Sequence, residues 1–135
     1  MDSLPGELVV LGLSVVLLVV HIMLQGQLAT ADRGLDWNAG PRDNSDEKPL
    51  SVRAGRAQRA LDNYKETYPA FIALALGLAV TGATGGIGSV GAWLWFLARI
   101  VYIPLYLTGV PKVRSLVFVM AMFGLLLMLL RFFFA

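Results

Sequence analysis

The sequence predicts an all-helical integral membrane protein in which four helices span the bilayer. Of its 135 residues, 57% are hydrophobic and only 15% are charged, whereas roughly a quarter of the residues of a soluble domain are charged. The hydrophobic residues form runs that match the roughly 20 helical residues needed to cross about 30 Å of hydrocarbon. Because unpaired backbone groups are prohibitively costly in lipid, we expect these runs to be helices of one membrane domain covering residues 1–135.

The first helix is predicted at about residues 4–31, where Ser14 and His21 are the only polar side chains of the central stretch. A cleaved signal peptide is the alternative interpretation, because the small residues at 29–31 resemble a cleavage site. Signal peptides begin with a basic region and have a shorter apolar stretch, whereas this chain begins with acidic residues. We therefore expect the segment to be retained as a membrane helix.

Three further helices are predicted at about residues 51–81, 92–108 and 112–134. The connection at 32–50 is polar and contains two prolines, which predicts a loop in water or on the headgroups. The second helix is polar in its first half and apolar from Pro69 onward. The glycine-rich stretch 82–91 is expected to be a flexible turn, and the third and fourth helices are separated by a break at 109–111.

Lysine and arginine collect in the first and third connections, which predicts that these connections face the cytoplasm. The basic residues there are Arg33, Arg42, Lys48, Arg53, Arg56, Arg59, Lys112 and Arg114. The N-terminus and the glycine-rich stretch have none, and Arg131 near the C-terminus is the single exception. We therefore expect both termini to lie outside the cytoplasm.

Several familiar chemistries are excluded by composition. The chain has no cysteine, hence no disulfide, thiol nucleophile or thiolate metal site. His21 is the only histidine, so we expect it to pack against a neighbour and expect no metal site. Residues 86–91 fit the dinucleotide pattern G-x-G-x-x-G, but that motif needs a preceding strand and an acidic residue about twenty positions later. No acidic residue follows Glu66, so the stretch 86–91 is interpreted as a turn. Separately, no nucleic-acid partner is expected.

Polar side chains occur deep in the second and third predicted helices, where ionisable groups are costly and usually mark function. At about 100° per residue, four polar side chains of the second helix fall within about 80° of arc, and three of the third within about 60°. These residues are Arg56, Arg59, Asn63 and Glu66 in the second helix and Arg99, Tyr102 and Tyr106 in the third. The two stripes predict one shared polar site.

A structural interpretation of these residues stays open, in which the arginines snorkel to the membrane surface and the aromatic residues lie at the interface. The aromatic residues concerned are Trp93, Trp95, Tyr102 and Tyr106. Glu66 and Arg99 are harder to explain in this way, because both lie more than two turns from the cytoplasmic ends of their predicted helices. Mutual neutralisation is the cheapest state for both charges, so we expect them to interact, directly or through a shared polar group.

The segment RALDNYKETYP at residues 59–69 resembles a signature of the MAPEG family, the membrane-associated proteins in eicosanoid and glutathione metabolism. It has the family's pattern at Arg59, Ala60, Asn63, Glu66 and Pro69. The segment LARIVYIPLYLTGVPKVRS at residues 97–115 is similar to a second signature through Arg99, Tyr102 and Tyr106. The resemblance extends over nearly the whole chain and is closest to bacterial members, which implies a location in the bacterial inner membrane.

The resemblance implies a homotrimer in which glutathione binds at the cytoplasmic side between subunits and an apolar substrate arrives from the membrane lipid. Small residues of the second helix would allow close approach between copies, namely Ala57, Ala60, Ala73 and Gly77. Glutathione has two carboxylates, an amine and a thiol, so arginines, an acid and a donor near the sulfur are needed. The residues expected to bind it are Arg56, Arg59, Asn63, Glu66, Arg99 and Tyr106.

In the leukotriene synthases of this family an arginine after the third helix activates the thiol, and others flank the end of the first helix. The candidates here are Arg114, Lys112 and Arg33, with Tyr102 as a second group near the sulfur. A glutathione transferase or peroxidase acting on apolar electrophiles is therefore expected. The alternatives are a non-catalytic family member that binds lipid or acts as a scaffold, and a small multidrug exporter. Such exporters depend on a glutamate deep in the first helix, whereas this helix has only Glu7 at its end.

Overall fold

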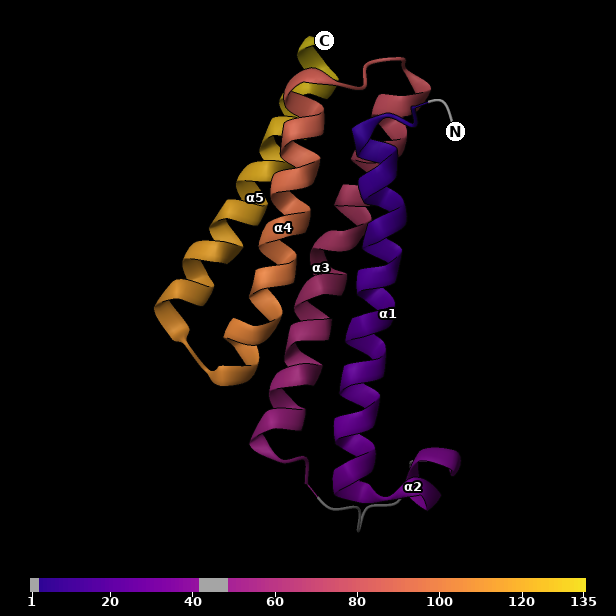
Figure 1. Cartoon of the computed structure of the whole chain (residues 1–135), viewed down its shortest axis with the longest axis vertical. Helices are drawn as coiled ribbons and strands as arrows, with labels where there is room; N and C mark the ends of the chain where they lie inside the picture. Colours follow the sequence, from indigo (N-terminus) through magenta and orange to yellow (C-terminus); the bar gives the residue numbers. More distant parts are fainter. Residues whose placement is uncertain (1–2, 42–48) are drawn as a thin grey trace.

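The computed structural model describes residues 3–41 and 49–135 of the chain. Four long helices and one short helix account for most of them (Figure 1), namely α1 (Gly6–Arg33), α2 (Leu35–Ala39), α3 (Val52–Val80), α4 (Gly86–Thr108) and α5 (Pro111–Phe134). The described residues contain no strand, so the prediction of an all-helical fold is confirmed. Arg42 and Lys48, which contributed to the predicted orientation, lie outside the described residues.

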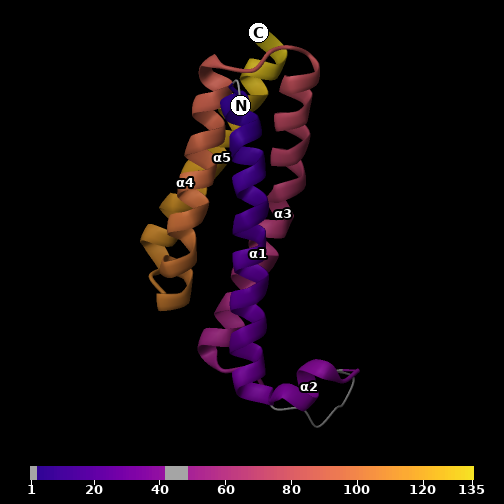
Figure 2. The same cartoon turned by 45° about the vertical axis from the view of Figure 1, so that its right-hand side comes forward.

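The long helices form two antiparallel pairs, α1 with α3 and α4 with α5 (Figures 1 and 2). α1 and α3 have 28 and 29 residues, whereas α4 and α5 have 23 and 24. At about 1.5 Å per residue, the first pair is about 42 Å long and the second about 35 Å. Both chain ends lie near the α3–α4 turn, so α1 and α3 project beyond the α4–α5 turn at the opposite end (Figures 1 and 2).

Among the described helices, α1, α4 and α5 are long and apolar enough to cross a membrane. The N-terminal half of α3 carries its charged residues, which lowers its mean hydropathy below that of the other three. The fourth predicted crossing, by α3, therefore stays a prediction. α3 nevertheless returns the chain from the far end of α1 to the start of α4, running antiparallel to α1 along its length (Figure 1).

The predicted glycine turn is shorter than expected, because α4 begins at Gly86 and not near residue 92. Gly82 and Gly85 form the actual turn, with φ angles of 69° and 96° that favour glycine. Gly91 is instead helical, and a Cβ atom there would collide with the carbonyl oxygen of Gly124 in α5. The interpretation of residues 86–91 as a turn is therefore wrong, because glycine in this stretch serves the close approach of α4 and α5.

Aromatic residues form the core between α1, α3 and α4. The Phe71 and Trp95 rings are stacked with their centroids 4.1 Å apart, and Tyr64 and Tyr68 pack beside them. The interfacial interpretation is therefore wrong for Trp95, which is 0% exposed, whereas Trp93 is 37% exposed.

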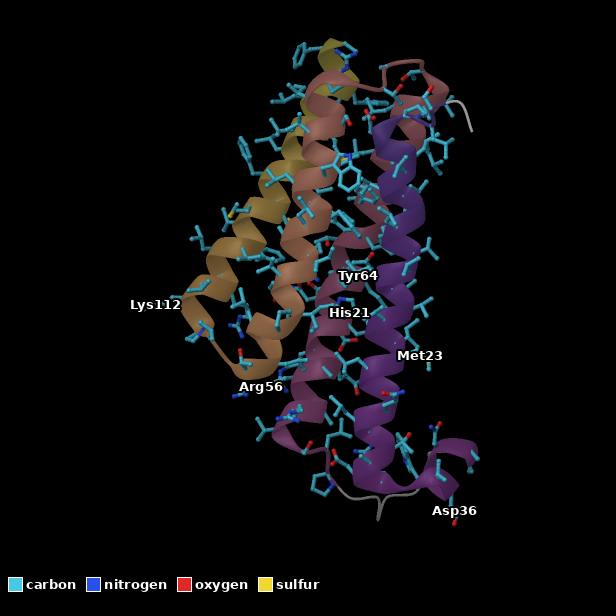
Figure 3. All side chains as sticks on the ribbon, viewed as in Figure 1. His21, Met23, Asp36, Arg56, Tyr64 and Lys112 are labelled. Atoms are coloured by element: carbon cyan, nitrogen blue, oxygen red, sulfur yellow. The ribbon has the colours of Figure 1, made fainter. Side chains whose placement is uncertain are left out.

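Polar groups of the first helix are buried against the same core. The Tyr64 hydroxyl donates to the Ser14 carbonyl oxygen at 2.6 Å, and the Ser14 hydroxyl lies 2.9 Å from that of Tyr68. The ring of His21 lies 4.9 Å from that of Tyr64, so the histidine packs against a neighbouring helix as predicted. Labels in Figure 3 mark His21 and Tyr64 between α1 and α3. The two hydrogen-bonding contacts explain how Ser14 is accommodated in an apolar helix.

The small residues of α3 do not form a common outer surface. Ala57 and Ala60 are each 1% exposed inside the chain, and Gly77 faces the Phe132 ring of α5. Ala73 is the one member of the predicted set that is exposed. The expectation that this set mediates contact between copies is therefore wrong, because packing within one chain already uses it.

Candidate functional site

A cavity of about 560 Å³ lies between α3, α4 and α5. Six of the eight predicted site residues line it, namely Arg59, Asn63, Glu66, Tyr102, Tyr106 and Arg114. Asp62, Ser115, Phe118 and Val119 complete the lining. The two polar stripes predicted from helical spacing therefore meet at one cavity.

Local sequence determines why these side chains meet. Arg59, Asn63 and Glu66 are spaced by four and three residues, which places them on one face of α3. The helix α4 ends at Thr108 and is capped by Gly109, whose φ of 76° suits a left-handed cap, and Pro111 starts α5 almost at once. This tight connection brings Arg114 back over α4, where its guanidinium carbon lies 4.7 Å from the centroid of the Tyr106 ring.

The cavity carries charges of both signs. Arg59 and Arg114 are its cationic residues, and Asp62 and Glu66 are its acidic ones. Asp62 lies 3.9 Å from Lys65 in an exposed pair of little energetic weight. Neither arginine has an ion-pair partner among the described residues, so both guanidinium groups are available for an anionic ligand.

Arg99 does not line the cavity, although it was predicted to bind the cofactor. Its side chain is 0% exposed and lies behind the lining, where one nitrogen donates to the Asn63 side-chain oxygen at 2.7 Å. Its guanidinium carbon lies 4.4 Å from the ring centroid of Tyr102 and 5.4 Å from that of Tyr64. Nε and Nη2 have no hydrogen-bond partner in the described part of the chain. Arg99 is thus a buried positive charge that positions two lining residues.

The direct form of the predicted Glu66–Arg99 interaction is wrong, because no ion pair joins the two among the described residues. Glu66 is exposed in the single chain, whereas Arg99 is fully buried. On α3, Glu66 lies about 60° of arc from Asn63, which is the residue of its stripe that contacts Arg99. Arg99 therefore bonds to the amide of Asn63 instead of to a carboxylate.

Arg56 is also absent from the cavity lining. Its Nη1 donates to the Leu107 carbonyl oxygen at 3.2 Å, at the end of α4. The reason is its position, since Arg56 lies one turn before Arg59, at the level where α4 ends and exposes its last carbonyl groups. Arg56 therefore lies outside this cavity, and its part in binding glutathione stays a prediction.

The three basic residues predicted as candidates for the position beside the glutathione thiol lie in different places. Lys112 lies in the first turn of α5 without lining the cavity, and Arg33 lies at the end of α1 with its guanidinium carbon 4.8 Å from the Trp37 ring centroid. Arg114 is the candidate that reaches the cavity.

Sequence reasoning missed four of the lining residues. Asp62 directly precedes Asn63 inside the 59–69 signature, so the motif itself could have indicated it. Phe118 follows Arg114 by four residues, about 40° around α5, so extending the spacing argument along the fourth helix would have found it. Ser115 and Val119 lie about 100° and 140° from Arg114, so spacing alone does not indicate them.

Comparison with protein families decides the assignment. The family model described as MAPEG family matches residues 10–134. The chain belongs to the MAPEG family. No curated protein and no solved structure matches this MAPEG chain. Both signature segments, 59–69 and 97–115, fall inside the matched range. Family membership together with three helices long and apolar enough to span a bilayer identifies an integral membrane protein.

Proposed function

We propose that this MAPEG protein binds glutathione in the cavity between α3, α4 and α5 and acts as a glutathione transferase or peroxidase on apolar electrophiles. The observation that carries the proposal is the cavity's combination of two arginines without ion-pair partners, two carboxylates and two tyrosines. Its volume of about 560 Å³ falls within the range of roughly 300–1,000 Å³ typical of small-molecule sites.

The residues present suit a ligand of this chemistry. Glutathione has carboxylates, for which Arg59 offers a guanidinium group, and an amine, for which Glu66 offers a carboxylate; for its thiol, Arg114 offers a second guanidinium group. The buried charge of Arg99 raises the electrostatic potential behind the lining, because its burial leaves it weakly screened. Two of its nitrogen atoms lack hydrogen-bond partners within the described residues, and Arg99 forms no ion pair there.

Six of the lining residues have a proposed role. Bound glutathione would supply a thiol that, once deprotonated, adds to an apolar electrophile. Arg59 and Glu66 hold the two ends of the peptide, and Arg114 or the Tyr102 hydroxyl stabilises negative charge on the sulfur. Phe118 and Val119 on α5 form an apolar wall beside which an electrophile from the lipid could approach.

The energy required of these groups is modest. A free thiol has a pKa near about 8.5, and lowering this by about two units requires roughly 2.7 kcal/mol of preferential stabilisation of the thiolate. A guanidinium in contact with the sulfur in a poorly hydrated site supplies energy of this order. Arg114 is only partly exposed and its guanidinium is stacked on Tyr106, so it is suited to this task.

We also propose that α3 crosses the membrane, that the chain assembles as a homotrimer and that the site faces the cytoplasm. Since α1 and α4 run in the same direction, the chain must cross back between them, and α3 makes this return. The exposed polar side chains of Arg59 and Glu66 need cover from a neighbouring copy or water. Arginines at the ends of α1 and α3 favour the cytoplasm for this end, and the resemblance to bacterial members favours the bacterial inner membrane.

Calorimetry and thiolate spectroscopy on detergent-purified protein test this function. We expect glutathione to bind and to develop thiolate ultraviolet absorbance, and we expect conjugation to a generic aryl halide. Arg114→Gln should remove the thiolate absorbance and slow conjugation, whereas Arg59→Gln should chiefly weaken glutathione binding. Arg53→Gln is the matched control, because Arg53 is an exposed arginine of α3 outside this cavity.

The outcomes separate the candidate functions. Absence of both glutathione binding and thiolate absorbance in the wild type would contradict the proposal and favour a non-catalytic MAPEG protein that binds lipid or acts as a scaffold. Cross-linking or native mass spectrometry in mild detergent should show a trimer. A clean monomer or dimer would contradict the assembly.

A further inference from the structure

A second cavity, of about 740 Å³, lies between α1, α3 and α4. Its apolar wall includes Leu24 and Leu28 of α1 and Leu107 of α4, and its polar residues include Arg53 and Arg56 of α3. We call this cavity the basic groove. It shares no lining residue with the cavity that holds Arg59 and Arg114.

The basic groove lies where the two helix pairs end at different levels. α4 stops at Thr108, while α1 and α3 continue past it toward α2 (Figures 1 and 3). The 23 residues of α4 span about 35 Å, close to the thickness of about 30 Å of a hydrocarbon core. The level at which α4 ends is therefore the level of the lipid headgroups. Figure 3 marks Arg56 beside this end of α4.

The charge of the groove has one sign. Arg53 and Arg56 lie one helical turn apart on α3, and no acidic residue lines the groove. Neither arginine has an ion-pair partner among the residues described. The bond from Arg56 to the Leu107 carbonyl holds its guanidinium at the groove, where it also interacts favourably with the C-terminal end of α4. Arg53 is exposed beside it.

This combination matches one class of ligand. Two arginines a turn apart bind the oxygens of a phosphate group well, because each guanidinium offers several fixed donors. Leucine side chains next to them suit an acyl chain that descends from the headgroup into the hydrocarbon. A phospholipid with a net negative charge has both parts, and it is already present at this depth of the bilayer.

We propose that the basic groove binds an anionic phospholipid of the surrounding bilayer, with its phosphate on Arg53 and Arg56 and one acyl chain along Leu24 and Leu28. The occupant is the intact lipid and not a free anion, because the apolar wall contributes to the same cavity. The inference does not depend on glutathione binding, since the two cavities have no residue in common.

Native mass spectrometry of the detergent-solubilised full chain tests the proposal by titration with defined lipids. Phosphatidylglycerol should bind at least about five-fold more tightly than phosphatidylcholine with the same acyl chains, since each basic residue near an anionic surface contributes roughly this factor. Arg53→Gln and Arg56→Gln should each reduce phosphatidylglycerol affinity by about five-fold. Lys112→Gln is the matched control, because Lys112 is an exposed cation near the same end of the molecule that lines neither cavity.

Two further measurements distinguish binding of an intact lipid from binding of a free phosphate anion. Glycerol phosphate and inorganic phosphate should fail to displace phosphatidylglycerol at concentrations far above that of the lipid. Leu28→Trp, which fills the apolar wall without changing charge, should also weaken lipid binding. Circular dichroism on every variant checks that the helices are intact, and the comparison of the two lipids on the wild type needs no variant.

Three results would overturn the proposal. Equal affinity for the two lipids would show that the lipid charge has no role. A loss of phosphatidylglycerol affinity in Lys112→Gln equal to that in the arginine variants would show diffuse electrostatic attraction without a specific site. Displacement by inorganic phosphate would show an anion site that does not recognise lipid.

Discussion

Replacing Asn63 with leucine tests the most specific contact behind the candidate site. Asn63 accepts a hydrogen bond from the fully buried guanidinium of Arg99 at 2.7 Å. Two other nitrogen atoms of that guanidinium already lack partners within the described structure. Asn63→Leu therefore leaves a third donor of a buried charge without an acceptor, whereas the Asn63 amide itself is only half-buried.

The expected magnitude follows from this asymmetry. Hydrogen bonds to charged groups contribute roughly 1.5–3 kcal/mol, and a buried charged donor without an acceptor bears that full loss. Asn63→Leu should therefore reduce the free energy of unfolding by roughly 1.5–3 kcal/mol in the wild-type background. In an Arg99→Met background no charge is left unsatisfied, so the same substitution should cost less than about 0.5 kcal/mol.

Equilibrium unfolding in mixed micelles, followed by far-ultraviolet circular dichroism, measures the four proteins of this double-mutant cycle. Lys65→Gln serves as the comparison, because Lys65 is exposed and pairs with Asp62 and not with a partner of Arg99. Its cost should be the same in both backgrounds to within about 0.5 kcal/mol. If Asn63→Leu costs as much with Met as with Arg at position 99, the hydrogen bond does not stabilise the fold and our account of Arg99 is wrong.

Three further predictions concern packing and topology. Gly91→Ala should lower the free energy of unfolding by roughly 1–3 kcal/mol, because its methyl group would collide with the backbone of α5. Gly12→Ala, where nothing lies within 4 Å, should not lower it, and equal losses in the two thermal melts would refute the close contact. Tyr64→Phe should cost about 0.5–1.5 kcal/mol by losing its 2.6 Å bond to the Ser14 carbonyl; an unchanged melting temperature would contradict this. Cysteines at Thr81 and Lys112, which are exposed at opposite ends of the helices, should react with impermeant maleimide from opposite sides of the membrane, and reaction of both from one side would overturn the topology.

The helical spacing of polar residues predicted most of the candidate site. Arg59, Asn63 and Glu66 share a face whatever surrounds α3, because the rotation per residue is fixed by the helix itself. The same argument brings Tyr102 and Tyr106 together on α4. Spacing within one helix was therefore sufficient for these residues.

Helical spacing did not predict the contacts of residues whose partners lie on a neighbouring helix. Arg56 belongs to the same stripe as Arg59, but its partner is a carbonyl that is exposed only because α4 ends there. Arg99 shares an arc with Tyr102, yet it faces the interior because Asn63 and Tyr64 lie on that side. Neither the level at which a helix ends nor the side on which its neighbour lies is encoded in the periodicity of one segment.

The glycine-rich stretch 82–91 also depends on a contact with another helix that local composition does not reveal. Its composition is typical of a turn, and Gly82 and Gly85 do form one. Gly91 has a different role, which depends on Gly124 more than thirty positions later in the sequence. Local composition could not distinguish a glycine needed for backbone conformation from one needed for contact between helices.

The seam between the two helix pairs has a thermodynamic consequence. Arg59 and Glu66 belong to the α1–α3 pair, and Tyr106 and Arg114 belong to the α4–α5 hairpin, so the candidate site exists only while the hairpin is docked. A ligand that touches both halves stabilises docking by RT ln(1 + [L]/Kd). A substitution that loosens the seam lowers the apparent ligand affinity in proportion to the docked fraction that it removes, even where it touches no lining residue. Ligand binding and docking of the α4–α5 hairpin are therefore thermodynamically coupled.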